Sequence, residues 1–171
     1  MQRVLIPSER VKLLEKDKSL ARKVEELCKC KIDINEEGID ITGDAYGEFS
    51  ARNILFAFGR GFDVQTACLL HNENFYFSMM DLAQFFGSDN RIRQVKARII
   101  GKGGKAKENI ERVSKARISI YGDTVSFIGT EREIEEAQTC VNALIDGDSH
   151  RSAYMKMEAV HRRNRLLAKG L

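Results

Sequence analysis

A short glycine-rich segment, Gly101-Lys102-Gly103-Gly104, is the part of this sequence best suited to binding chemistry. Two more lysines, Lys105 and Lys107, follow it directly. Glycine has no Cβ, so a sugar-phosphate backbone can approach such a turn to contact distance. A helix that begins just after the glycines directs its free N–H groups and its positive dipole end toward the phosphates. The segment therefore predicts a site for a phosphate-bearing ligand.

The basic residues of the chain are concentrated around this segment. Residues 91–121 hold 10 Lys and Arg against 2 Asp and Glu, whereas residues 1–90 hold 11 against 15. The following residues 122–150 hold 1 against 7, and residues 151–171 hold 6 against 1. A basic block inside an acidic chain is typical of an anion-binding surface. The last block is expected to be a basic helix over 152–167.

Hydrophobic periodicity predicts the elements that position the glycines. The expected elements are a helix over 105–115, strands over 116–121 and 124–129, and a helix over 131–145. Gly122-Asp123 is a two-residue turn, so the two strands form a hairpin. Thr130 followed by Glu133 is a capping box that opens the last helix. A further short apolar helix, ending at Ile100, runs into the glycines.

The same order of elements occurs twice in the chain. A shift of 86 positions superposes residues 11–58 on 97–144 without a gap and preserves the apolar pattern. The first copy reads as a strand over 3–6, helices over 8–14 and 19–29, strands over 31–35 and 38–42, and a helix over 45–58. A helix over 63–70 joins the copies, and the second copy opens with a strand over 74–81. Each copy is thus β-α-α-β-β-α.

The glycines allow two other interpretations. The spacing Gly101-x-Gly103-x-x-Ala106 satisfies a loose dinucleotide-binding fingerprint, with Asp123 about 20 residues on. That fingerprint needs a buried parallel strand before it, whereas the preceding segment RIRQVKARII is charged and has helical period. A purely structural turn between two helices leaves the extra glycines and the basic block unexplained. A Walker-type loop is excluded, because GKGGKAK lacks both its spacing and its terminal Lys-Ser/Thr pair.

The unit containing RIIGKGGKAK (98–107) and ISIYGDTVSFIG (118–129) resembles a type I KH domain, in which a GXXG loop clamps about four nucleotides of single-stranded nucleic acid. Together with GRGF (59–62) and ALIDGDSH (143–150), the tandem arrangement is similar to the KH proteins of small-ribosomal-subunit assembly, the partner-of-Nob (Dim-type) factor and its Krr-type relative. The resemblance covers essentially the whole chain. The chain lacks the N-terminal extension of eukaryotic members, so an archaeal source is expected.

The resemblance implies an α+β fold of two type I KH-like units in tandem, each a three-stranded sheet with helices on one face, followed by a C-terminal helix. The expected domains are residues 1–71, a degenerate KH-like domain without GXXG; residues 72–150, the KH domain with the loop; and residues 151–171, the basic helix. The RNA-binding residues expected from the loop and its flanks are Arg98, Ile99, Ile100, Gly101, Lys102, Gly103, Gly104, Lys105, Lys107, Arg117 and Ile118.

The first copy departs from this pattern at its loop. The positions that match Gly101–Gly104 are Glu15, Lys16, Asp17 and Lys18. Side chains there block close approach of a nucleic-acid backbone, and the two carboxylates repel its phosphates. The first copy is therefore expected not to clamp RNA, and the resemblance implies a scaffold or protein-docking role for it.

No catalytic set is evident in the sequence. His71, His150 and His161 fit no nucleophile-base arrangement, and the four cysteines offer no second pair at zinc spacing, so neither an enzyme activity nor a metal or cofactor is expected. MQRVLIPSER is too short an apolar stretch for a signal peptide, and no apolar run of about 18 residues occurs, so the expected compartment is the cytoplasm.

The function that the resemblance implies is non-enzymatic binding of single-stranded RNA during small-subunit assembly, near the 3′ end of the rRNA. The implied partners are a PIN-type nuclease, the rRNA dimethyltransferase and translation initiation factor two. The alternatives are a Krr-type role, a general RNA chaperone, a protein scaffold whose KH folds no longer bind RNA, and a nucleotide-dependent enzyme. The basic tail is expected to extend the RNA surface, so that removing residues 160–171 weakens binding without unfolding the core.

Overall fold

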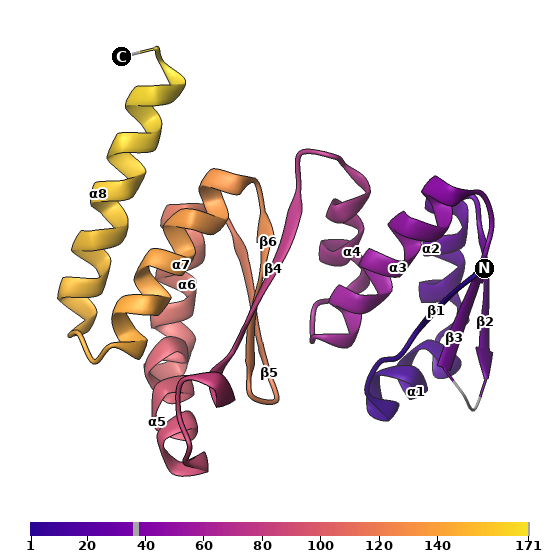
Figure 1. Ribbon diagram of the computed structural model, residues 1–171, viewed down its shortest axis with the longest axis horizontal. Coiled ribbons are helices and arrows are strands. Elements are labelled where there is room, and N and C mark those ends of the chain that lie inside the picture. The colour runs from indigo at the N-terminus through magenta and orange to yellow at the C-terminus, as the bar shows by residue number, and fades with distance from the viewer. Residues whose placement is uncertain (36–37, 171) are drawn as a thin grey trace. The chain divides into compact units, whose positions relative to one another are not determined.

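The computed structural model of the protein describes residues 1–35 and 38–170. The chain divides into two compact units, Met1–Phe77 and Ser78–Leu171 (Figure 1). One strand, β4 (Tyr76–Asp81), begins at the end of the first unit and belongs to the sheet of the second. Each unit combines a three-stranded sheet with helices, so the predicted α+β class is confirmed.

The first unit contains β1 (Gln2–Val4), α1 (Ser8–Lys16), α2 (Lys18–Cys28), β2 (Lys31–Asn35), β3 (Gly38–Thr42), α3 (Ala45–Gly59), α4 (Val64–Ala67) and the 3-10 turn η1 (Cys68–His71). Its strands lie in the order β1-β3-β2, and both pairings are antiparallel. Ile39 and Ile41 of the central strand β3 are buried, as are Val24 of α2 and Leu55 of α3. The first strand ends at Val4, two residues earlier than predicted.

The second unit continues from β4 through η2 (Leu82–Gln84), α5 (Asp89–Ile100), η3 (Lys102–Gly104), α6 (Lys105–Ser114), β5 (Arg117–Tyr121), β6 (Thr124–Gly129), α7 (Glu131–Ile145) and α8 (His150–Ala168). Its strands lie in the order β4-β6-β5, and helices α5, α6 and α7 cover one face of the sheet (Figure 1). Every residue of the central strand β6 is buried. Phe127 of this strand packs in one core with Ile110, Leu144 and Met157.

The 86-residue repeat is also visible in side-chain contacts that the sequence did not reveal. Glu25 of α2 accepts a hydrogen bond from the backbone N–H of Ile32 at 2.8 Å. Its counterpart Glu111 of α6 accepts one from the N–H of Ile118, also at 2.8 Å. Both bonds join the second helix of a unit to its edge strand, so the two units share a construction detail as well as an order of elements.

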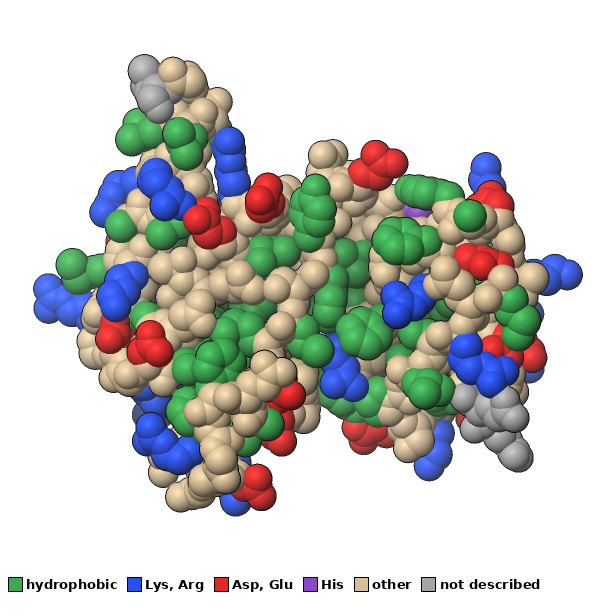
Figure 2. All heavy atoms as spheres, in the orientation of Figure 1, with side chains coloured by type: hydrophobic (Ala, Val, Ile, Leu, Met, Phe, Trp, Pro, Cys, Tyr) green, Lys and Arg blue, Asp and Glu red, His purple; other side chains and the backbone are tan. Residues whose placement is uncertain are grey.

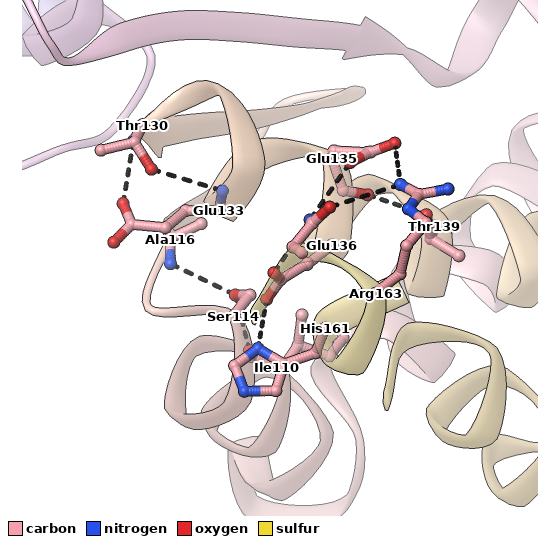
Figure 3. A network of polar contacts seen from close by, with 11 residues as sticks. Ile110, Ser114, Ala116, Thr130, Glu133, Glu135, Glu136, Thr139, His161 and Arg163 are labelled. Atoms are coloured by element: carbon pink, nitrogen blue, oxygen red, sulfur yellow. Dashed lines mark hydrogen bonds and ion pairs between the residues drawn. The ribbon is translucent and has the colours of Figure 1, made fainter. Parts of the chain in front are cut away.

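The start of α7 is the capping box that the sequence predicted. The Thr130 hydroxyl accepts a hydrogen bond from the Glu133 N–H at 3.4 Å, and the Glu133 carboxylate accepts one from the Thr130 N–H at 2.8 Å (Figure 3). The reciprocal bonds satisfy two backbone donors that the first turn of a helix otherwise leaves unpaired. They define where β6 ends and α7 begins.

Helix α8 is longer than the predicted 152–167 and is held to α7 by polar groups as well as by Met157. The buried carboxylate of Glu136 lies 2.8 Å from Nδ1 of His161 and accepts a hydrogen bond from the Asn164 amide at 3.1 Å. On the exposed side, Arg163 pairs with Glu135 at 2.6 Å (Figure 3). Beyond Asn164, every described residue of the helix is exposed.

Candidate nucleic-acid interface

The loop between α5 and α6 depends on its glycines for two different reasons. Gly101 has φ +74° and ψ 172°, and a Cβ built on it meets the Cβ of Ala106 at 2.5 Å and its backbone nitrogen at 2.7 Å. Gly103 and Gly104 also have positive φ, +61° and +77°, but a Cβ on either meets nothing within 4 Å. Gly101 is therefore required by packing, whereas the other two leave bare backbone facing open space.

Helix α6 begins without a side-chain cap. Its N-cap residue is Gly104, in the left-handed region, and no side-chain hydrogen bond caps the helix there. The N–H of Lys105 donates to the carbonyl of Lys102, and no side chain caps the N–H groups that follow it in the first turn. An uncapped, glycine-lined helix start is a favourable position for a phosphate.

The cations around the loop fall into two groups. Lys102, Lys105 and Arg117 are exposed, and no carboxylate within the described chain forms a salt bridge with them. Lys107 instead pairs with Glu111 one helical turn on, at 3.2 Å. The first three cations are free to neutralise phosphates, whereas Lys107 must leave a partner to do so.

The structure separates the three isoleucines that the sequence assigned to base contacts. Ile99 and Ile118 are 0% and 4% exposed, and both belong to the hydrophobic core of the unit. Ile100 is 37% exposed at the end of α5. Because the side chains of Ile99 and Ile118 do not reach the surface, only Ile100 is placed to contact a base directly.

Arg98, expected at the RNA surface, forms structural hydrogen bonds within the second unit. Its guanidinium donates to the carbonyl of Leu144 at 2.8 Å and to the carbonyl of Asp148. In return, Nε2 of His150 lies 2.8 Å from the Arg98 carbonyl. These contacts bind the end of α5, three residues before the first loop glycine, to the connection between α7 and α8. Arg98 thus anchors the start of the loop, and its contact with RNA stays a prediction.

Replacing Arg98 by Ala is expected to lower the free energy of unfolding by about 2 kcal/mol, because two carbonyls lose a charged donor. Urea unfolding followed by circular dichroism measures this loss. Arg117→Ala is the matched control: its side chain is exposed, so its effect on stability is expected within about 0.5 kcal/mol. Unchanged stability of Arg98→Ala together with weakened RNA binding would restore Arg98 to the interface.

The corresponding loop of the first unit already contains its own anion. The Asp17 carboxylate accepts hydrogen bonds from the hydroxyl of Ser19 at 2.6 Å and from its N–H at 3.0 Å. These bonds hold the pKa of Asp17 below its ordinary value, the hydroxyl contributing most. The start of α2 is therefore capped from within, by a carboxylate at the position that matches Gly103. The sequence predicted the repulsion but not this occupancy.

The remaining chemistry-bearing groups of the described chain are the cysteine thiols and the side chains that could hold a metal ion. Burial raises the pKa of the Cys140 thiol to about 12 and, as the largest cause, that of Cys30 to about 11, so both are protonated at neutral pH and poor nucleophiles. Over residues 1–35 and 38–170, no group of three or more His, Cys, Asp or Glu side chains is arranged to hold a metal ion. In the same part of the chain, no helix is long and apolar enough to cross a membrane. The dinucleotide interpretation lacks its strand, since the residues before Gly101 are helical.

Comparison with known proteins identifies the second unit and its relatives. The family model for the second KH domain of PNO1, a eukaryotic type KH-domain (KH-domain type I), matches residues 76–162. A KH domain-containing protein of Methanocaldococcus jannaschii is 34% identical over 160 residues, which is 90% of this chain and 70% of that protein. The pre-rRNA-processing protein PNO1 of Chaetomium thermophilum is 26% identical over 170 residues, 93% of this chain and 65% of that protein.

A solved structure extends the similarity over both units. A chain in the crystal structure of the a/eIF2alpha–aDim2p–rRNA complex from Pyrococcus horikoshii superposes with a TM-score of 0.84 and is 34% identical. The match covers 95% of this chain and 94% of that one. The similarity therefore includes the first unit, which the family model does not match.

Proposed function

The chain belongs to the PNO1-type KH-domain family, and on that premise we propose that it binds single-stranded rRNA through the Gly101–Gly104 loop as a non-enzymatic factor of small-ribosomal-subunit assembly. The observation that carries the proposal is the bare backbone of Gly103 and Gly104, at a start of α6 that no side chain caps, between the exposed Lys102 and Lys105. The names of the relatives, a pre-rRNA-processing protein and a complex containing rRNA, support the choice of ligand.

The proposed mechanism divides the work between backbone and side chains. The N–H groups at the start of α6 hold a phosphate, while Lys102 and Lys105 neutralise its neighbours. Ile100 provides an apolar surface for an unstacked base. Phosphate contacts fix the position of the strand but carry no base information, so sequence preference depends on Ile100 and on the exposed edge of β5. We place the ligand near the 3′ end of the rRNA, as the family resemblance implies.

We propose that the first unit binds protein partners, while the second unit binds RNA. The complex from Pyrococcus horikoshii is named for an initiation-factor subunit as well as for rRNA, which supports translation initiation factor two as a partner of this chain. A PIN-type nuclease and the rRNA dimethyltransferase are the further partners that the resemblance implies, and the cytoplasm is the compartment in which we expect these contacts. The first unit, with its internally capped loop, is the proposed docking surface for proteins.

The salt dependence of RNA affinity tests the proposed ligand contacts. With three to five phosphates neutralised, log K for a single-stranded RNA is expected to fall with log salt with a slope of about −2 to −3.5. Fluorescence anisotropy of a labelled hexamer from the 3′ end of the rRNA, measured from about 50 to 300 mM KCl, gives the slope. A slope near zero would contradict phosphate clamping and favour the scaffold interpretation.

A truncation after Asn164 tests the role of the basic tail. The structure changes the expected result of removing residues 160–171: the shorter chain loses His161 and Asn164, both partners of the buried Glu136, and is expected to be destabilised by about 3 kcal/mol. Removing only residues after 164 spares these contacts and deletes Arg165 and Lys169. RNA affinity is then expected to fall, and the slope of log K against log salt is expected to be smaller in magnitude by about 0.7 to 1.4. Unchanged affinity would assign the tail to proteins instead of RNA.

A further inference from the structure

The first unit contains a cavity of about 520 Å³ that the proposed RNA site does not use. Five aromatic side chains line it: Tyr46 and Phe49 from α3, and Phe75, Tyr76 and Phe77 from the segment that leads into β4. A cavity of this size with mostly apolar walls is within the range of ligand pockets. All of its lining residues belong to the first unit.

The walls of this aromatic pocket are held in place by contacts behind them. The Tyr46 hydroxyl donates to the His71 carbonyl at 3.2 Å, and the two rings meet edge to face with centroids 5.8 Å apart. His71 is fixed in turn by its Nδ1, which lies 2.9 Å from the Ser50 hydroxyl oxygen. On the other side, Phe77 packs edge-on against Phe56 at 5.5 Å. These contacts fix Tyr46, His71 and Phe77 in the pocket wall, which lowers the entropic cost of binding there.

Three of the aromatic rings that line the pocket are about half exposed. Tyr46, Phe49 and Tyr76 are 52%, 55% and 53% exposed. Aromatic side chains normally bury most of their area, and a cluster of exposed ones marks a binding surface. The flat faces of these rings are negative in electrostatic potential and attract cations that lie over them.

The charged residues in and around the pocket favour a positively charged ligand. Among the described residues that line the pocket, Glu73 carries a formal charge and none is Lys or Arg. The whole unit, residues 1–77, has 11 Lys and Arg against 13 Asp and Glu. A phosphate-bearing strand meets no counter-charge in this pocket, whereas a cation meets both the ring faces and the carboxylate.

We propose that the aromatic pocket receives an arginine side chain from a basic segment of a protein partner. A guanidinium is planar, stacks on aromatic faces and forms hydrogen bonds within its own plane. Stacked on Phe49 or Tyr76, it can direct those donors at the Glu73 carboxylate. The pocket thus gives the first unit a specific protein-binding chemistry, separate from the RNA loop of the second unit.

The test uses the full chain and two synthetic peptides, acetyl-Gly-Gly-Arg-Gly-Gly-amide and the same peptide with citrulline, a neutral isostere, in place of arginine. Peptide titrations are followed by NMR on the tyrosine ring signals. The arginine peptide is expected to shift the signals of Tyr46 and Tyr76 saturably, and the citrulline peptide to bind several-fold more weakly. Phe49→Ala and Glu73→Gln, both outside the supporting contacts, are each expected to weaken arginine-peptide binding about two- to five-fold.

Uridine monophosphate and a single-stranded RNA hexamer complete the experiment. Neither is expected to shift these tyrosine signals, and Phe49→Ala is expected to keep the hexamer affinity of the unchanged chain. Equal binding of the two peptides, or unchanged binding by both variants, would overturn the proposal. Saturable shifts from uridine monophosphate at the same rings would also overturn it, by assigning the pocket to a nucleobase. Because RNA hexamer binding is measured separately, failure of the proposed RNA binding can be distinguished from failure of the proposed arginine binding.

Discussion

Replacing Lys102 and Gly103 together by aspartate is expected to abolish binding of single-stranded RNA while leaving the protein folded. The change places two carboxylates and a Cβ where the nucleic-acid backbone must approach, and it removes one of the free cations. At about 0.1 M salt the expected loss of affinity is about 100-fold or more. The fold tolerates the change because a Cβ on Gly103 meets nothing within 4 Å, and aspartate is among the residues that adopt its left-handed conformation.

A charge-matched change in the first unit is the control for this prediction. The double change Lys16→Asp with Lys18→Gln alters the net charge by the same −3. It lies at the junction of α1 and α2, where the Asp17 side chain already caps α2. Its effect on affinity is expected to stay within about three-fold, through long-range electrostatics alone. Thermal unfolding of both variants checks that each is folded. Equal losses from the two loops would mean that net charge, rather than the glycine loop, determines binding.

Gly101→Ala and Gly103→Ala are expected to separate the structural and ligand-binding uses of the loop. A Cβ at Gly101 is 2.5 Å from the Ala106 Cβ in a backbone conformation that is nearly restricted to glycine. That variant is expected to lose about 3 kcal/mol of stability. Gly103→Ala meets no neighbour, so its expected cost is about 1 kcal/mol from the left-handed φ alone, while its RNA affinity falls through the added methyl group.

Urea unfolding and anisotropy with the RNA hexamer measure both quantities for each variant. Adding Ala106→Gly to Gly101→Ala is the matched control. It removes the Cβ contact but leaves the backbone nitrogen at 2.7 Å, so stability is expected to recover only in part. If Gly101→Ala were as stable as Gly103→Ala, the packing argument for Gly101 would be wrong.

Local pattern was sufficient to predict the elements and the loop of this protein. The helix from Glu131, its capping box and the hairpin around Gly122-Asp123 depend on neighbours within a few residues, and the structure confirms them. The turn at Gly101–Gly104 could be predicted for the same reason, because the positive φ angles that favour glycine are a local property of the backbone. The 86-residue repeat then placed the same elements in the first unit, where the glycines are absent.

The orientation of individual side chains could not be predicted in the same way. Ile99 and Ile100 are adjacent on a helix, about 100° apart, and only contact with the rest of the core decides that Ile99 faces inward. The structural contacts of Arg98 could not be predicted because its acceptors, Leu144 and Asp148, lie 46 and 50 residues away. For Ile118, the alternation of β5 was a usable signal, since it shares the core-facing side of the strand with Ile120.

The polar contacts between α7 and α8 could not be predicted for the same reason, since their residues lie 25 to 29 positions apart. Glu136 and Asn164 are buried as a pair, yet in the sequence each reads as an exposed residue on a charged helix. The aromatic pocket also escaped the sequence analysis, although Tyr46 and Phe49 are spaced to share one face of α3. The sequence pattern did not predict that residues 75–77 return to that face of α3.

A titration of the uniformly ¹⁵N-labelled full chain with a single-stranded hexamer from the 3′ end of the rRNA tests the central claim most directly. If the glycine loop clamps the RNA, the backbone amides of Gly101–Lys105 shift first and saturate at one equivalent, while those of Lys16–Ser19 in the first unit stay in place. Saturable shifts at Lys16–Ser19 alone would contradict the assignment of RNA to the second unit. The absence of saturable shifts at both loops would contradict it as well.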